Sequence, residues 1–251
     1  MIHRKGAPMQ HWLGFLRSFL IYHNPVTIAA WRRFYRGVLT PGDLVFDVGA
    51  HMGTRARAMR AAGARVVAFE PQAPFAGFLR RTLPRDITLV EAAIGAEETV
   101  AEMAVSSRHP TVSSLATGFV GGASQAHGFE HVSWDRRQQV QMVTLDGLIA
   151  RHGMPSYVKI DVEGFEIEVL SGLSQPLPML SVEYLPAFPK LTVGVIDRLC
   201  ALGDYRFNPV QGETGAFLWP DWRDADAAKA WLAGLPEDAE SGDLFARVAS
   251  H

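Results

Sequence analysis

The sequence predicts an α/β fold in which helices cover both faces of a mostly parallel β-sheet. Two observations support this prediction. From about residue 41 onward, short apolar runs alternate with stretches of helical periodicity, which is the pattern of a parallel sheet. The composition is that of a globular domain, because 48% of the 251 residues are hydrophobic and 20% are charged.

Five apolar runs are expected to form strands of this sheet: Leu44–Val48, Val66–Glu70, Ile87–Glu91, Tyr157–Asp161 and Leu180–Tyr184. Four segments between them show the spacing of an amphipathic helix: Thr54–Ala62, Pro74–Leu83, Leu145–Arg151 and Glu166–Leu170. A polar insertion rich in glycine and serine interrupts the alternation over residues 97–144, between the flanks Thr99–Val105 and Gln138–Val143. A loop of this length is usually functional or mobile.

The main domain is expected to span residues 41–220, with an extension at each end. Residues 1–40 predict a helical extension of two helices, divided at Asn24-Pro25. The second helix combines aromatic residues with arginines, so it either packs as a cap or makes weak contact with a membrane surface. Tyr205–Val210 and Ala216–Trp219 predict a hairpin of two closing strands. Residues 221–251 are expected to form a helical tail.

Charge and cysteine content exclude several function classes. The 24 Lys and Arg residues nearly balance 26 Asp and Glu residues, so no overall field attracts nucleic acid. The single cysteine, Cys200, allows neither a disulfide nor a cysteine-based zinc site within one chain, which favours a reducing, cytoplasmic location. We recognise no signal peptide, and no segment reaches the roughly 18 apolar residues that span a bilayer.

The first predicted strand ends in a turn that is typical of a site for a nucleotide-containing cofactor. Gly49 lets the backbone approach a ligand closely, and the amides that start the next helix can bind an anionic group. Three residues separate Gly49 from Gly53, so the dinucleotide fingerprint G-x-G-x-x-G is absent. With Asp47 two positions before Gly49, this spacing favours a cofactor that bears a carboxylate. A tight turn without a ligand is the alternative.

Charged residues also follow two later strands. Glu70 ends the second strand, where a carboxylate can accept hydrogen bonds from both ribose hydroxyls; a solvated strand end is the alternative. In a central strand, Lys159 alternates with apolar residues and needs a partner, for which the candidates are Asp161, Glu163 and Glu183. Because ligands bind at the carboxyl edge of a parallel sheet, this cluster is the best candidate for catalysis. A structural ion-pair network is the alternative.

Several segments together resemble the FkbM family of S-adenosylmethionine-dependent methyltransferases. The segments that carry the resemblance are Asp47–Gly53, Phe69-Glu70-Pro71, Thr144-Leu145-Asp146, Lys159–Gly164 and Glu168-Val169-Leu170. The resemblance implies a Rossmann-like class I methyltransferase fold, with a seven-stranded sheet whose last strand is antiparallel. It also implies S-adenosylmethionine as the cofactor and a hydroxyl of a sugar, glycolipid or secondary metabolite as the methyl acceptor.

The resemblance extends to individual cofactor-binding positions. The residues implied to hold the methionine end are Asp47, Gly49, Ala50 and Gly53. His51 stands where the family has asparagine, and its imidazole can still donate a hydrogen bond to a carboxylate. Glu70 is implied to bind the ribose, and the adenine is implied to lie beside Ala92 and Ala93.

Methyl transfer to oxygen requires alignment of the acceptor and removal of its proton. Asp161 is the expected general base, with Lys159 and Glu163 setting its charge state. Alternatively, Asp161 and Glu183 bind a magnesium ion that lowers the pKa of the acceptor hydroxyl. The insertion is a candidate lid, and a further set of candidate bases lies within it: His109, His127 and His131.

Two other function classes stay open on sequence grounds. A nicotinamide-dependent oxidoreductase also uses an acidic residue at the end of its second strand, although the third glycine is missing here. A catalytically silent, cofactor-binding scaffold is the other class, although the charges at 159, 161 and 163 favour activity. Protein or nucleic-acid N-methylation is disfavoured, because Asp161–Gly164 stands where such enzymes carry a tetrapeptide of the Asn-Pro-Pro-Tyr type.

Overall fold

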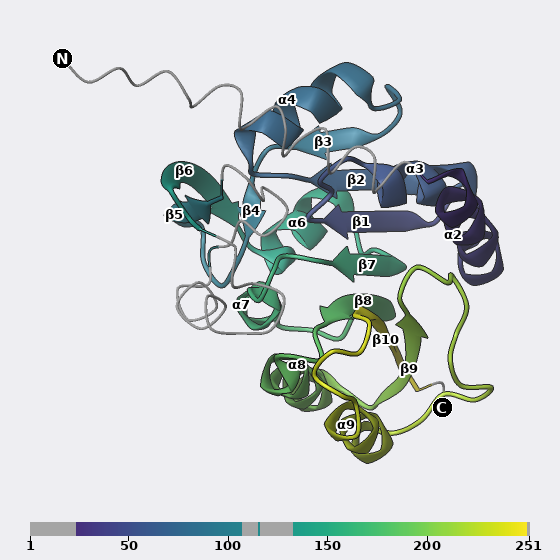
Figure 1. Ribbon diagram of the computed structural model, residues 1–251. Coiled ribbons are helices and arrows are strands. Elements are labelled where there is room, and N and C mark those ends of the chain that lie inside the picture. The colour runs from purple at the N-terminus through teal and green to yellow at the C-terminus, as the bar shows by residue number, and fades with distance from the viewer. Residues whose placement is uncertain (1–23, 107–114, 116–132, 250–251) are drawn as a thin grey trace.

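A computed structural model describes residues 24–106, 115 and 133–249 of the chain (Figure 1). Strands and helices alternate along the described chain, and the helices lie on both faces of a central sheet. The first helix expected in the N-terminal extension lies outside the described residues. The three histidines of the insertion also lie outside them.

The central sheet has seven strands in the order β3-β2-β1-β7-β8-β10-β9. Their bounds are β1 (Leu44–Val48), β2 (Arg65–Phe69), β3 (Thr88–Val90), β7 (Tyr157–Ile160), β8 (Met179–Tyr184), β9 (Tyr205–Gln211) and β10 (Gly242–Val248). Strands β3, β2, β1, β7 and β8 pair in parallel, whereas β10 is antiparallel to both β8 and β9. The prediction of a mostly parallel, seven-stranded α/β sheet is therefore confirmed.

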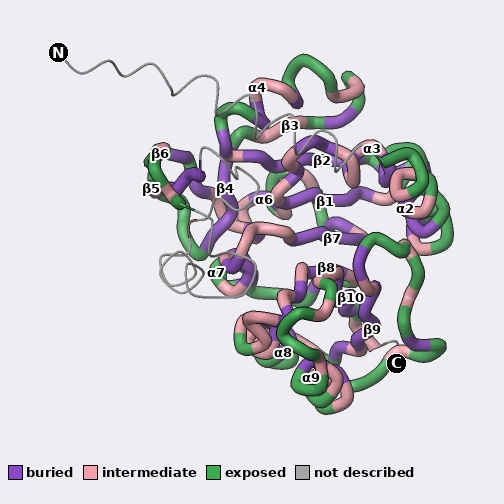
Figure 2. Tube along the Cα trace, viewed as in Figure 1, coloured by how far each residue is buried: buried purple, intermediate pink, exposed green. Residues whose placement is uncertain are grey.

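Alternating side chains of β1 divide the core between the two faces of the sheet. Leu44, Phe46 and Val48 pack on one face, against α6 (Leu145–His152), α7 (Glu166–Ser171), α8 (Pro189–Leu202) and α9 (Ala225–Ala233). Val45 packs on the other face, against α2 (Pro25–Val38), α3 (Thr54–Ala61) and α4 (Ala73–Thr82). Figure 2 shows that β1 and β7 are buried along their whole length. Helix α8 is an element that the sequence analysis missed.

The N-terminal helix α2 packs on the sheet through its aromatic residues. It starts at the cap Asn24, whose side chain accepts a hydrogen bond from Val26 N. Trp31, Phe34 and Tyr35 are buried, whereas the arginines of the helix are exposed: Arg32, Arg33 and Arg36. In α2 the aromatic side chains pack on the sheet, and contact of the N-terminal helices with a membrane surface stays a prediction. Among the described residues, no helix has the length and apolar character needed to cross a bilayer.

The C-terminal segment corrects two predictions. Residues 221–251 do not form a helical tail, because α9 is followed by β10, which lies inside the sheet between β8 and β9. The expected hairpin is also wrong, since β9 pairs with β10 and residues 216–219 form no strand. Instead, the side chain of Asn208 bonds both the N–H and the carbonyl of Trp219. Charged Asp243 and Arg247 interrupt the apolar run of β10, which hid this strand from the sequence analysis.

Part of the predicted insertion forms a small second sheet. Its strands are β4 (Ala93–Ile94), β5 (Thr99–Val105) and β6 (Arg136–Val143), in the order β4-β6-β5. Met103, Val140 and Met142 lie in its apolar cluster. Figure 1 places this sheet at the carboxyl ends of β1 and β7. Its residues Ala93, Ile94 and Met103 line the cavity described below.

Candidate active site

The predicted site residues meet at a cavity of about 320 Å³ at the carboxyl edge of the sheet. This volume is within the range of small-molecule sites. All but one of the predicted residues line the cavity: Asp47, Gly49, Ala50, His51, Glu70, Ala92, Ala93, Lys159, Asp161, Glu163 and Glu183. The exception is Gly53, which caps the start of α3 in a left-handed conformation. The cavity therefore unites the residues that the sequence analysis assigned to the cofactor with those it assigned to catalysis.

The turn after β1 requires glycine at position 49. Gly49 has a φ of 78°, and a Cβ on this residue would collide with the backbone carbonyl of Asp161. The amides of Gly49 and Ala50 both donate to Phe69 O, at 3.1 and 2.9 Å. The turn thus lies directly against the exits of β2 and β7, with its backbone facing the cavity.

Glu70 is held rigidly at the end of β2. Its carboxylate accepts hydrogen bonds from the amides of His51 and Gln72, both at 2.8 Å, and the residue is 5% exposed. Burial raises the pKa of Glu70 to about 7, although the two amide hydrogen bonds oppose the shift. Burial also lowers the pKa of His51 to about 3, so its imidazole is neutral near pH 7. A fixed carboxylate at this position suits the two hydroxyls of a ribose.

Asp47 is fully buried on the wall of the cavity. Neither of its carboxylate oxygens has a hydrogen-bond partner among the described residues. Burial raises its pKa, while Lys159 and Arg55 act in the opposite direction. A buried carboxylate without a partner is destabilising. Because Asp47 lines the cavity, a ligand bound there could supply the missing partner. The ammonium group of S-adenosylmethionine is a suitable partner.

Lys159 and Asp161 form an ion pair across the exit of β7. The Nζ–Oδ2 distance is 2.7 Å, and the lysine residue is 3% exposed. Burial lowers the pKa of Lys159, but the charges of Asp161 and Asp47 outweigh burial and raise it. Burial alone would raise the pKa of Asp161, but the charge and hydrogen bond of Lys159 outweigh burial, so the pKa of Asp161 is lowered. Both members of the pair are therefore charged, and Asp161 is the partner that Lys159 requires.

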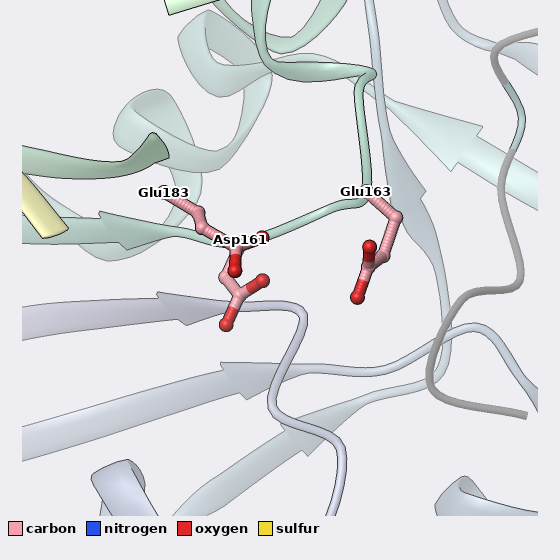
Figure 3. Close-up of side chains that lie close together, drawn as sticks. All are labelled: Asp161, Glu163 and Glu183. Atoms are coloured by element: carbon pink, nitrogen blue, oxygen red, sulfur yellow. The ribbon is translucent and has the colours of Figure 1, made fainter. Parts of the chain in front are cut away.

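Three carboxyl groups converge beside this pair. One oxygen from each of Asp161, Glu163 and Glu183 lies within 4.8 Å of the other two, and Figure 3 shows the Asp161 and Glu183 side chains next to each other. Burial, followed by the charge of Asp161, raises the pKa values of Glu163 and Glu183 well above the usual range. The cluster therefore has a high affinity for a proton or another cation.

Glu166 supports the loop that presents these carboxyl groups. Glu163 has a φ of 53°, a conformation that side chains rarely adopt away from functional sites. The Glu166 carboxylate accepts hydrogen bonds from the amides of Val162 (3.3 Å) and Gly164 (3.2 Å), one on each side of Glu163. Burial raises the pKa of Glu166 to about 7. Glu166 thus fixes the strained loop, and its raised pKa shows that the folded protein favours the protonated form of this side chain.

We expect Glu166→Gln to change how stability depends on pH. Since the folded-state pKa of about 7 exceeds the ordinary 4.5, Glu166 stabilises the fold below pH 4.5 and loses that contribution as pH rises through 7. Glutamine does not titrate, so it removes this loss. Between pH 5 and pH 8, the free energy of unfolding of the variant should therefore rise relative to that of the wild type by about 2–3 kcal/mol. Urea unfolding at a series of pH values measures the difference. Exposed Glu168→Gln is the matched control, and a parallel pH dependence of Glu166→Gln and the wild type would contradict the expectation.

Arg55 and its partners are cavity residues that the sequence analysis missed. Arg55 Nη2 donates to Asp243 (3.1 Å) and Glu213 (3.3 Å), and its guanidinium carbon lies 3.1 Å from the centre of the Trp31 ring. Trp31 Nε1 also donates to Glu213. These residues come from α2, α3, the segment after β9 and β10. Asp243 alone gave a signal, as a charge within an apolar run, because contacts across nearly 190 positions leave no local pattern.

The fold and this cavity together define a class I S-adenosylmethionine-dependent methyltransferase. The mostly parallel sheet has one antiparallel strand, and the turn at Gly49, the carboxylate of Glu70 and buried Asp47 lie at its carboxyl edge. The model of the Methyltransferase FkbM domain matches residues 47–203, and the chain belongs to this family. A search of curated proteins finds no match.

Solved structures of methyltransferases also resemble this chain at low identity. Magnesium protoporphyrin IX methyltransferase from Synechocystis PCC 6803, with bound SAM, is 10% identical, with a TM-score of 0.45 over 94% of this chain and 84% of that one. The precorrin-6y C5,15-methyltransferase of Geobacter metallireducens is 13% identical, with a TM-score of 0.42 over 90% of this chain and 87% of that one.

Proposed function

We propose that the protein transfers a methyl group from S-adenosylmethionine to a hydroxyl of a sugar, glycolipid or secondary metabolite. The observation that carries this proposal is the carboxyl cluster of Asp161, Glu163 and Glu183 on the wall of the cofactor cavity. An alcohol is a weak nucleophile until its proton is removed, so transfer to oxygen needs a nearby base more than transfer to an amine does. The resemblance to the FkbM family supports the same acceptor class.

The residues of the cavity divide the work of binding and proton removal. The bound cofactor supplies an electrophilic methyl group on a sulfonium. Asp47 accepts from the ammonium of the methionine end, and Glu70 accepts from the ribose hydroxyls, with the adenine near Ala92 and Ala93. Asp161 accepts the hydrogen bond of the acceptor hydroxyl and aligns its oxygen for in-line attack. The binding roles follow the expectation from sequence, whereas Asp161, expected there to be the general base, here orients the acceptor.

The pKa values suggest which carboxyl group takes the proton. Lys159 lowers the pKa of Asp161, which makes Asp161 a good hydrogen-bond acceptor but a weak base. Glu183 has a raised pKa, and its Oε2 is buried without a hydrogen-bond partner among the described residues. Because Lys159 already pairs with Asp161, whereas Glu183 Oε2 is unpartnered within the same cluster, we assign proton uptake to Glu183 and orientation to Asp161.

A mass-shift screen with isotopically labelled cofactor tests the proposal. Purified protein is incubated with panels of hydroxylated glycans and metabolites, and products are sought at the mass of one added labelled methyl group. Titration calorimetry with S-adenosylhomocysteine and NAD accompanies the screen. Methylation of oxygen with binding of the adenosyl ligand supports the proposal. Binding of NAD alone would support an oxidoreductase, and adenosyl-ligand binding without turnover on any acceptor would support a silent scaffold.

Removal of divalent metal distinguishes the two roles considered for the carboxyl cluster. Oxygen ligands of this kind suit magnesium, and Asp161 and Glu183 are the residues that would hold it. However, Asp161 already pairs with Lys159, so we expect activity in excess EDTA to stay within about twofold of the untreated rate. A radiometric methyl-transfer assay measures this. A larger loss that magnesium restores would assign the cluster to metal binding instead.

A further inference from the structure

Arg55 lines the cavity, and one nitrogen of its guanidinium group has no hydrogen-bond partner among the described residues. Its Nη2 is engaged by Asp243 and Glu213, and its planar group stacks on Trp31. Its Nη1 is buried and has no hydrogen-bond partner among the described residues. A buried guanidinium nitrogen without an acceptor is costly, so this nitrogen is suited to an anionic oxygen of a ligand.

Asp47 and Arg55 carry opposite charges on the same cavity, and each has buried polar atoms without a hydrogen-bond partner among the described residues. Both residues line it, and neither bonds the other, since Arg55 pairs only with Asp243 and Glu213 among the described ion pairs. Their charges nevertheless interact, because Arg55 opposes the burial-driven rise in the pKa of Asp47. A ligand end that carries an ammonium and a carboxylate on one carbon would satisfy both groups at once. The methionine end of the cofactor has this chemistry.

The other cation on this wall is less suited to the carboxylate. Lys159 is 3% exposed, and Asp161 occupies its ammonium at 2.7 Å. Arg55, by contrast, is fixed by three contacts and offers a planar donor that matches carboxylate geometry. Preorganisation of this kind limits the entropy lost on binding.

We propose that Arg55 binds the carboxylate of the methionine end of the cofactor through Nη1. This inference rests on the proposed use of S-adenosylmethionine and adds a residue outside the positions implied by the family resemblance. Arg55 also connects α2, α3 and β10 around the cavity, so the same contact links cofactor binding to the C-terminal strand.

Decarboxylated S-adenosylmethionine isolates this contact, since it lacks only the carboxylate. We expect the wild type to bind S-adenosylmethionine about 10- to 100-fold more tightly than the decarboxylated ligand in titration calorimetry, the range for one charge-assisted contact. In Arg55→Met this preference should fall to about twofold or less, because only the intact ligand loses affinity. Arg55→Lys keeps the charge and should show an intermediate preference. Arg60→Gln, on the exposed side of the same helix, should retain the full preference.

The possible outcomes are distinguishable. Equal weakening of both ligands by Arg55→Met would show that Arg55 is structural and overturn the inference. An unchanged preference in that variant would also overturn it. If the wild type bound neither ligand, the proposed cofactor itself would be wrong. Thermal unfolding of each variant monitors folding. If Arg55→Met does not fold, Arg55→Lys replaces it in the comparison. The carboxylate contact would then be rejected if Arg55→Lys kept the full wild-type preference for S-adenosylmethionine over the decarboxylated ligand, or if the wild type itself showed no such preference.

Discussion

Asp161→Asn is expected to lower kcat for methyl transfer by about 10²-fold, the cost of misplacing a reacting group. Asparagine keeps the shape of the side chain, but it accepts the hydrogen bond of the hydroxyl more weakly and cannot pair ionically with Lys159. The dissociation constant of S-adenosylhomocysteine should change by less than about threefold, since binding depends on other cavity residues. Single-turnover rates and calorimetry on the same protein preparation measure the two quantities.

The stability of this variant must be measured alongside its rate. Lys159 is buried, and loss of its carboxylate partner is expected to cost about 1–2 kcal/mol, less than for a fully buried pair because the Asp161 side chain is 37% exposed. Asp86→Asn removes an exposed ion pair with Arg60 and is the matched control. A wild-type rate for Asp161→Asn would remove Asp161 from the mechanism. Glu183→Gln should reduce kcat by about 10²-fold if Glu183 takes the proton.

Gly49→Ala is expected to abolish cofactor binding at micromolar concentrations. An alanine at φ of 78° is strained by about 1–2 kcal/mol, and its Cβ would collide with the Asp161 carbonyl, which cannot move without distorting β7. We expect the affinity for S-adenosylhomocysteine to fall by at least about 100-fold and the free energy of unfolding to fall by about 2–4 kcal/mol. Calorimetry and urea unfolding provide these values.

Gly37→Ala is the control for this substitution. Gly37 lies near the end of α2, and a Cβ there would have no atom within 4 Å. Alanine favours a helix over glycine, so this variant should be as stable as the wild type or more stable by up to about 1 kcal/mol. If Gly49→Ala bound S-adenosylhomocysteine as tightly as the wild type does, the turn after β1 would not be part of the cofactor-binding site.

The parallel part of the fold was predictable because its signals are local. Each strand from β1 to β8 in the central sheet is a short apolar run, and each predicted helix has an apolar face, so bounds differ from expectation by at most one residue. The cavity position followed from topology, since the carboxyl ends of parallel strands meet at one edge. Gly49, Glu70 and Lys159 were identified because glycine or charge at such an end is rare without a function.

The remainder depends on contacts between distant parts of the chain. Strand β10 carries Asp243 within an apolar run, and only its pairing with Arg55 makes that charge tolerable inside the sheet. Likewise, Lys159 lowers the pKa of Asp161, whereas burial raises the pKa of Glu183, and both effects come from the tertiary structure. No single-sequence pattern reports such long-range electrostatic interactions. The residues missed by sequence analysis are therefore those whose chemistry is set by tertiary neighbours.

The position of β10 has a consequence for biosynthesis. Its hydrogen bonds join β8 on one side and β9 on the other, so β9 has no place in the sheet until β10 arrives. During translation, residues up to 248 must leave the ribosome before β10 can insert between β8 and β9. Until then, β8 presents an open edge to other nascent polypeptides, and Arg55 lacks Asp243. The wall of the cavity that Arg55 and Asp243 form is therefore completed only after β10 has joined the sheet.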